Sequence, residues 1–254
     1  MSYNKFIIIT FFLFSTLIFA QHLSDDIDEI RTESGIDPTR VSTRIAYTFL
    51  IQDPKGNSGQ IKNRLSLNLG VNNWSFSTKY EAISKTTDVP GSGFVSSFSD
   101  VKFSISNTFF TKEPHSLATA VEFSVPFGKP GFGSQYFSMK PSLSYVLTIS
   151  PSVFLALQPQ YIFDLMKDYS HSELSVFTLK MFLAKYWKNG FFAVIETRPI
   201  YDLTAEEFDL IISPVIGKAL GGGYNLIFLA EFPTRKVTFD SSGPIYQFGF
   251  NKSF

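Results

Sequence analysis

The chain ends on Ile245-Tyr246-Gln247-Phe248-Gly249-Phe250-Asn251-Lys252-Ser253-Phe254. One parity of this stretch is aromatic apart from Lys252, and it comprises Tyr246, Phe248, Phe250 and Phe254. The other parity is small or polar and comprises Gln247, Gly249, Asn251 and Ser253. Because successive side chains of a β-strand point to opposite faces, this period of two predicts a strand with an aromatic face and a small polar face.

The same alternation fills the chain from Val41 onward. About twelve segments alternate apolar and polar residues, and turn-forming residues separate them. The expected strands are 45–51, 62–69, 74–81, 101–109, 117–127, 137–147, 153–164, 177–184, 193–198, 208–216, 224–232 and 245–254. Connections after the odd-numbered strands tend to be longer, including a Gly- and Ser-rich loop at 85–98, and those after the even-numbered strands are tighter. The pattern predicts an all-β fold, a transmembrane antiparallel up-and-down β-barrel that the C-terminal strand closes.

Parity alone does not say whether the apolar face points into a soluble core or out to lipid. Charge is nearly absent from one face of many strands, and the aromatic strand ending in Phe254 resembles the terminal strand of bacterial outer-membrane β-barrels. That resemblance implies that Tyr246, Phe248, Phe250 and Phe254 are an assembly signal, with lipid and the barrel assembly machinery as partners. An open sheet edge in hydrocarbon would leave backbone groups unsatisfied, so the sheet is expected to close. Prolines inside the expected strands are predicted at bulges or at the rim, and they are Pro126, Pro141, Pro159, Pro199 and Pro214.

The N-terminal residues predict secretion. Lys5 precedes an apolar run from Phe6 to Phe19, and Ala20 comes just before a polar segment, so residues 1–20 are expected to be a cleaved signal peptide. Residues 21–40 carry six acidic residues and two arginines without strand alternation, which predicts a short acidic periplasmic extension. Residues 41–254 would then form a barrel in the outer membrane of a Gram-negative bacterium.

Composition narrows the function classes. The formal net charge is zero, so no basic field favours nucleic acid. The chain has no Cys, which excludes disulfides, thiolate chemistry and cysteine zinc sites. No cluster has metal-ligand spacing, and the Gly-rich stretches at 128–133 and 221–223 lack the Lys-Ser/Thr pair and following helix of a phosphate loop. No metal and no cofactor are therefore expected.

Three short motifs resemble a family of outer-membrane proteins named after the MetA pathway of phenol degradation. They are Ser99–Phe103 at a strand start, Ser124–Gly128 at a strand end, and Met139–Tyr145 after a Gly-rich loop. The similarity covers residues 93–164, and Phe127 stands where the family has Thr. The resemblance implies a barrel of this size with a role in uptake, and it supplies no site residues.

The polar parity carries charges of both signs that a barrel would turn inward. The expected lumen-lining residues are Arg44, Lys62, Arg64, Lys79, Glu81, Lys102, Glu122, Lys140, Asp164, Lys180, Glu196, Arg198, Asp209 and Glu231. They favour a water-filled pore, and a lumen closed by salt bridges, as in a structural or adhesion barrel, is the alternative. The second and third strands are expected to pair as a hairpin, which puts Lys62, Arg64, Lys79 and Glu81 on one face.

An outer-membrane lipid hydrolase is the competing class, and it would need a His and a Ser on one strand face. His115-Ser116 and His171-Ser172 are adjacent pairs, whose members point to opposite faces of any strand. His22 and Ser24 have the right spacing but lie in the polar extension. We therefore predict a channel or transporter for passive passage of small solutes and no enzyme, with the solute unidentified.

Overall fold

The structure is a computed structural model that describes residues 27–52, 59–86, 94–166, 173–235 and 243–254. The predicted signal peptide, His22, Ser24, His171 and Ser172 lie outside these residues. The described helix is α2 (Ile27–Ser34). The strands are β1 (Arg44–Gln52), β2 (Gln60–Val71), β3 (Trp74–Thr86), β4 (Phe94–Phe98), β5 (Val101–Lys112), β6 (His115–Val125), β7 (Ser138–Ser150), β8 (Val153–Asp164), β9 (Ser175–Tyr186), β10 (Phe191–Asp202), β11 (Glu207–Gly221), β12 (Tyr224–Arg235) and β13 (Ile245–Ser253).

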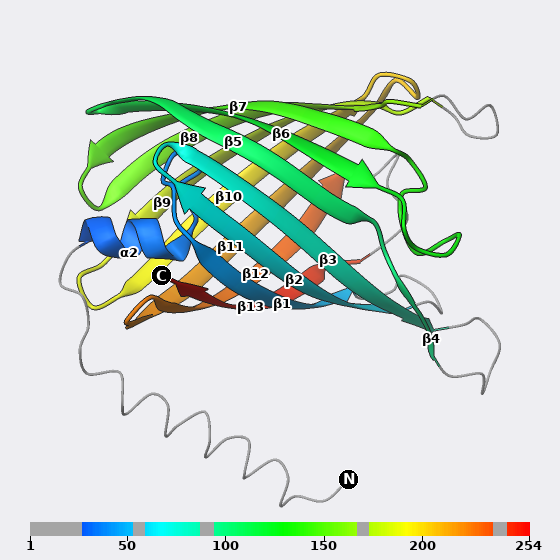
Figure 1. Ribbon diagram of the computed structural model, residues 1–254, viewed down its shortest axis with the longest axis horizontal. Coiled ribbons are helices and arrows are strands. Elements are labelled where there is room, and N and C mark those ends of the chain that lie inside the picture. Colours follow the sequence, from blue (N-terminus) through cyan, green and yellow to red (C-terminus); the bar gives the residue numbers. More distant parts are fainter. Residues whose placement is uncertain (1–26, 53–58, 87–93, 167–172, 236–242) are drawn as a thin grey trace, which may run out of the picture.

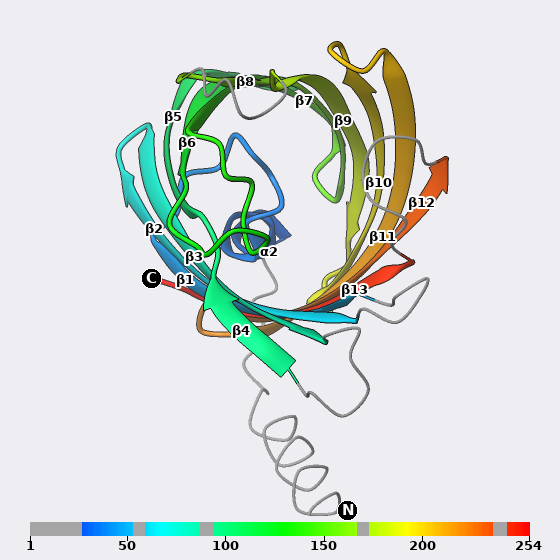
Figure 2. The same cartoon turned by 90° about the vertical axis from the view of Figure 1, so that its right-hand side faces the viewer.

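The strands form one antiparallel sheet that closes into a barrel (Figures 1 and 2). Strand β1 pairs with β2 on one edge and with β13 on the other, from Arg44↔Ser253 to Gln52↔Ile245. The N–H of Phe254 adds a bond to the carbonyl of Thr43 at 3.0 Å. Among the described strands, β4 pairs with β3 alone, so twelve strands make the wall. The predicted barrel and its closing strand are confirmed, and each wall strand has a neighbour at both edges, as hydrocarbon requires.

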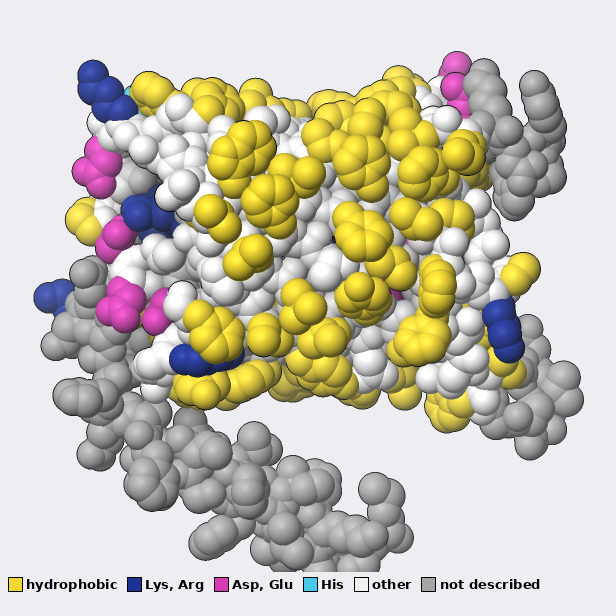
Figure 3. All heavy atoms as spheres, viewed as in Figure 1, with side chains coloured by type: hydrophobic (Ala, Val, Ile, Leu, Met, Phe, Trp, Pro, Cys, Tyr) yellow, Lys and Arg dark blue, Asp and Glu magenta, His cyan; other side chains and the backbone are white. Residues whose placement is uncertain are grey.

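The exterior of the barrel is apolar. Figure 3 shows hydrophobic side chains spread over the middle of the wall, with charged groups toward its two ends. On β13 the aromatic parity points outward, and Phe248 is 60% exposed while Asn251, on the other parity of the same strand, is 3% exposed. A soluble sheet would bury the aromatic face, so this inverted arrangement is that of a transmembrane barrel. No described helix has the length and apolar character needed to cross a membrane.

The two ends of the barrel differ in their connections. Turns at 72–73, 113–114, 151–152, 187–190 and 222–223 lie at the end that carries α2 and the C-terminus (Figure 1). The connections at the opposite end include 126–137 and 165–174. Outer-membrane barrels place short turns in the periplasm and longer loops outside, so we expect the α2 end to face the periplasm.

This orientation predicts a labelling pattern for single cysteines, which the natural chain lacks. Ala205→Cys, exposed between β10 and β11, should react with an impermeant maleimide on intact cells. Lys188→Cys, exposed in the turn before β10, should react only after the outer membrane is permeabilised. Labelling of Lys188→Cys but not Ala205→Cys on intact cells would invert the topology.

The prediction that residues 85–98 form a loop is wrong at both ends of this range. Strand β3 continues to Thr86, and β4 pairs with it from Ala82↔Phe98 to Thr86↔Phe94. The pairing of β3 with β5 begins only at Lys79↔Lys102, so β4 covers an edge of β3 that would otherwise be open. Glycines and serines around β4 hide its alternation in the sequence.

Four of the five prolines lie in strand interiors and not at bulges, which corrects the prediction for these four. Pro141, Pro159, Pro199 and Pro214 belong to β7, β8, β10 and β11, whereas register shifts occur at other positions. Each of these prolines is paired with one neighbouring strand and left unpaired with the other. For example, Arg198 and Pro199 of β10 are missing from its register with β9. Because proline lacks an N–H, it interrupts the hydrogen-bonded pairing with one neighbouring strand, while the register with the other neighbouring strand is kept. Pro126 directly follows β6.

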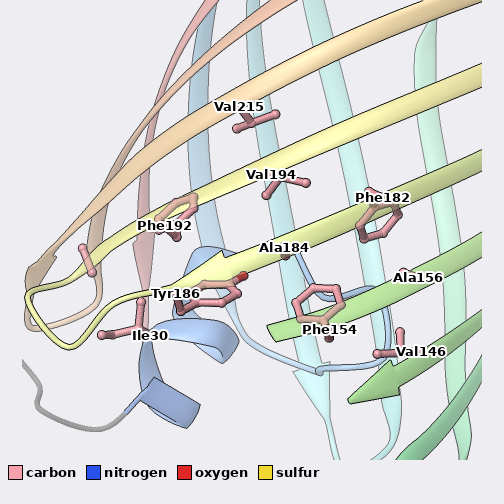
Figure 4. Packing of buried hydrophobic residues seen from close by; sticks show 11 residues of the cluster. Ile30, Val146, Phe154, Ala156, Phe182, Ala184, Tyr186, Phe192, Val194 and Val215 are labelled. Atoms are coloured by element: carbon pink, nitrogen blue, oxygen red, sulfur yellow. The ribbon is translucent and has the colours of Figure 1, made fainter. Parts of the chain in front are cut away.

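An apolar core lies inside the barrel at the α2 end (Figure 4). Inward side chains of five strands, β7 to β11, form it together with Ile30 of α2, which is fully buried. The rings of Phe154 and Tyr186 stack at 6.1 Å, and those of Tyr186 and Phe192 lie 5.5 Å apart. Figure 2, which looks along the barrel, shows α2 within the ring of strands. The helix thus fills one side of the lumen at this end.

Candidate functional site: the barrel lumen

The lumen carries its charges on two walls. The cationic wall, which we define as β2, β3, β5, β6 and β7, bears Lys62, Arg64, Lys79, Lys102 and Lys140 against Glu81 and Glu122. The acidic wall, β8 to β12, bears Lys180 and Arg198 against Asp164, Glu196, Asp209 and Glu231. The lumen is therefore polarised across its width, with cations in excess on one side and carboxylates on the other.

Ion pairs connect the strands of the cationic wall. Arg64 faces Glu81 in the register of β2 with β3, and Nη2 lies 2.5 Å from Oε1. Lys79 turns away from this hairpin and passes β5 to reach Oε2 of Glu122 at 2.7 Å. Lys140 binds the other oxygen of the same carboxylate at 2.6 Å. The four hairpin residues share a face, but their charges do not form one closed network.

The acidic wall holds a second network. Nη2 of Arg198 lies 2.8 Å from Oε1 of Glu196 and 3.1 Å from Oε1 of Glu231. The amide of Gln247 on β13 donates to the same Glu231 oxygen at 3.4 Å. Both networks are partly buried, so each charge has a partner where water is scarce.

Besides Arg44, which packs against Gly35, three lumen cations stand apart from these networks. Within the part of the chain that the structure describes, Lys62, Lys102 and Lys180 have no carboxylate within 4.0 Å. Lys62 and Lys102 lie on the cationic wall, and Lys180 faces it from β9. A cation without a fixed partner is available to a passing anion, which makes these lysines the candidates for solute contact.

Residues 27–43, which we call the plug segment, occupy the lumen at the α2 end. A buried ion pair holds the segment in shape, with Arg31 Nη2 2.5 Å from Asp37 Oδ2. The same guanidinium donates to Thr148 at 3.1 Å and lies 4.4 Å from the ring centre of Phe154. The side chains of Arg31 and Asp37 are almost fully buried, which costs both groups their hydration. The ion pair, the hydrogen bond and the cation–π contact offset this cost.

Polar side chains of the wall bind the end of α2. The last carbonyls of a helix have no partner within the helix. Here Asn225 and Ser253 donate to the carbonyl of Glu33 at 3.2 and 3.0 Å, and Asn251 donates to that of Ser34 at 3.3 Å. Burial raises the pKa of the Glu33 carboxyl, and the nearby charge of Glu29 adds to this. The helix therefore ends on donors supplied by strands far away in the sequence.

The plug segment then crosses to the other side of the barrel. Gly35 has a φ of +67°, and a side chain there would overlap the guanidinium of Arg44. Thr108 of β5 donates to the carbonyl of Thr39 at 2.9 Å. The segment thus contacts both walls and narrows the periplasmic mouth.

A cavity of about 420 Å³ remains between the plug segment and the cationic wall. Hydroxyl and amide side chains line much of it, namely Ser66, Asn68, Ser75, Ser77, Ser104, Ser106, Ser144, Gln158 and Asn251. Ser34, Gly35, Ile36 and Pro38 form its floor. Sequence reasoning missed this chamber, because serines on the inward parity were treated only as the polar side of each strand.

Some predicted lumen residues lie at the margins of the lumen. Arg44 packs against Gly35 of the plug segment. Asp164 accepts the N–H of Leu174 at 3.3 Å at the end of β8, and Asp209 is buried.

His115 forms a hydrogen bond with the hydroxyl of Tyr145 at 2.8 Å on the exposed surface, and Ser116 takes no part in this contact. No group of three potential metal ligands is present among the described residues.

No protein-family model and no curated protein sequence matches the chain. Solved structures do resemble it. The COG4313 outer membrane channel from Pseudomonas putida F1 aligns with a TM-score of 0.66 at 10% identity, over 84% of this chain and 96% of that one. The NanC porin aligns at 0.63 and 11% identity, over 83% and 100% of the two chains. The KdgM porin, solved in complex with disordered oligogalacturonate, aligns at 0.61 and 14% identity, over 83% and 99%. The chain therefore has the fold of an outer-membrane porin barrel.

Proposed function

We propose that this protein is an outer-membrane channel for the passive passage of small solutes, with a preference for anions. The observation that carries the proposal is the polarised lumen, in which Lys62, Lys102 and Lys180 stand outside the ion-pair networks. A cationic surface in a narrow pore raises the local concentration of anions. The porin and channel structures that share the fold support the channel class.

Two segments of the chain would deliver it to the outer membrane. Residues 1–20 act as the signal peptide, and the aromatic face of β13 with Phe254 provides the assembly signal, as the sequence predicts. The resemblance of residues 93–164 to the MetA-pathway family agrees with an uptake role. Membership of that family is part of the proposal.

Charge reversal on the cationic wall tests the anion preference. Lys62→Glu with Lys102→Glu leaves the ion pairs of Arg64 and Lys79 in place. The reversal potential in a salt gradient should shift from anion toward cation preference. The shift should be largest at low salt, because charges are screened over about 10 Å at roughly 0.1 M.

A matched control places the same change of charge outside the lumen. Lys112→Glu with Lys188→Glu alters two exposed residues near the turns and should leave the reversal potential as in the parent. A stable, conducting Lys62→Glu/Lys102→Glu variant with the parent's reversal potential would contradict the assignment of these lysines to the pore.

A structural barrel with a closed lumen is the second candidate. The plug segment favours it, because Ile30 and the Arg31–Asp37 pair are buried inside one mouth. In that case the refolded protein would carry no current whatever the lumen charge. The proposal assigns no catalytic residue to either candidate.

A further inference from the structure

The lining of the chamber beside the plug segment differs from the ion-pair networks of the two walls, because hydroxyl and amide side chains make up much of it. Of its cations, Lys79 is paired with Glu122 at 2.7 Å, whereas Arg44 has no carboxylate within 4.0 Å among the described residues and its buried Nη1 has no hydrogen-bond partner there. Its other polar groups are uncharged hydroxyls and amides. The chamber therefore offers many uncharged hydrogen-bonding groups and one guanidinium without an ion-pair partner.

Hydroxyl and amide side chains from different strands lie within hydrogen-bond distance of one another in the chamber. Ser77 and Ser104 hydrogen-bond each other at 2.5 Å, Ser75 donates to Asn68 at 2.6 Å, and Gln158 donates to Ser144 at 2.9 Å. Ser66 and Ser106 make no side-chain hydrogen bond to the residues that the structure describes. Each hydroxyl can donate one bond and accept two, so the paired serines also keep capacity for a ligand.

Apolar groups complete the lining. Ile36 and Pro38 of the plug segment, Ala46, Ala118 and Ile227 present small apolar surfaces to the same space. A sugar or polyol has this dual character, with hydroxyls on its edge and C–H groups on its faces. The volume of about 420 Å³ is within the range of small-molecule sites, roughly 300–1,000 Å³.

We propose that this chamber is a binding site for a small polyhydroxylated solute, a sugar or a polyol, on its way through the barrel. The inference rests on the proposed function and deepens it, since it assigns a class of solute to the channel. Ser66 and Ser106 are the first partners for solute hydroxyls, and the Ser77–Ser104 pair is the second.

Saturation-transfer NMR on the refolded protein with sorbitol and with maltose tests the site without requiring conduction. The parent should give a saturable signal with at least one of these probes. Ser77→Val with Ser104→Val should weaken that binding at least tenfold. Ser84→Val with Ser96→Val is the matched control, because it removes a similar serine pair (2.8 Å) that lies away from the chamber, and it should bind like the parent.

Ala120→Phe provides a second test, since it fills the chamber without removing a hydroxyl and should abolish the signal. Absence of binding by both probes, unchanged binding in both chamber variants, or displacement of the probe by inorganic sulfate would overturn the assignment to a polyhydroxylated solute. Conductance is recorded separately on the same preparations. A silent parent that still binds the probe would refute the channel while supporting the chamber.

Discussion

Removal of residues 21–40 is expected to raise the single-channel conductance of the refolded barrel several-fold. The deletion takes away α2 and most of the plug segment, which lies within the ring of strands at the periplasmic mouth (Figure 2). Closure of the barrel does not depend on these residues, because β1 pairs with β2 and β13 from Arg44 onward. Heat-modifiable migration on gels would show that the truncated chain still folds.

A point substitution should release the plug segment without shortening the chain. Arg31→Ala removes the nearer cation from the buried carboxylate of Asp37, which keeps only Arg40 at 4.0 Å, and breaking a buried pair typically costs about 3–5 kcal/mol. The control is Asp28→Ala, which removes a largely exposed ion pair with Arg40, a type of contact worth about 0–1 kcal/mol. We expect high or noisy conductance for Arg31→Ala and parental traces for Asp28→Ala. Equal conductance of the parent, the truncated chain and Arg31→Ala would mean that the segment does not restrict the lumen.

Phe248→Lys is expected to destabilise the barrel by about 2–4 kcal/mol, the cost of Lys or Arg on the lipid face near the midplane. Phe248 lies in the middle of β13, points outward and packs on Phe228 with ring centres 5.0 Å apart. Lys in its place would put a charge into hydrocarbon and lose this aromatic contact. Urea unfolding of the protein in lipid vesicles measures the loss of unfolding free energy.

The neighbouring residue is the control for this prediction. Gln247 faces the lumen, where its amide donates to Glu231 at 3.4 Å. Gln247→Lys places the same charge beside a carboxylate and should change stability little. If the two variants lost equal stability, the assignment of the aromatic face of β13 to lipid would be wrong.

The strands could be predicted from the sequence because the decisive information is local. A period of two shows in every wall strand, and pairing of neighbours along the chain follows from the tight turns between them. The hairpin of β2 and β3 and its Arg64–Glu81 contact are consequences of this local order. Strand β4 escaped prediction because it is short and its neighbouring residues have loop composition.

The plug segment and the chamber could not be predicted in the same way. Helix α2 has only eight residues and depends on donors from Asn225, Asn251 and Ser253, which are far away in sequence. The contact of Lys79 with Glu122 passes over β5, so no pairing rule for adjacent strands indicates it. The chamber serines carry little signal individually, and the barrel's curvature alone brings them around one cavity.

The central claim is that the lumen conducts and prefers anions. The most direct measurement is the current carried by the refolded, full-length mature chain in a planar bilayer, with its reversal potential in a KCl gradient. The account predicts discrete, ohmic steps and a reversal potential on the anion-selective side that moves toward zero as salt rises. A folded barrel that stays silent, or one that conducts with cation preference, would contradict it.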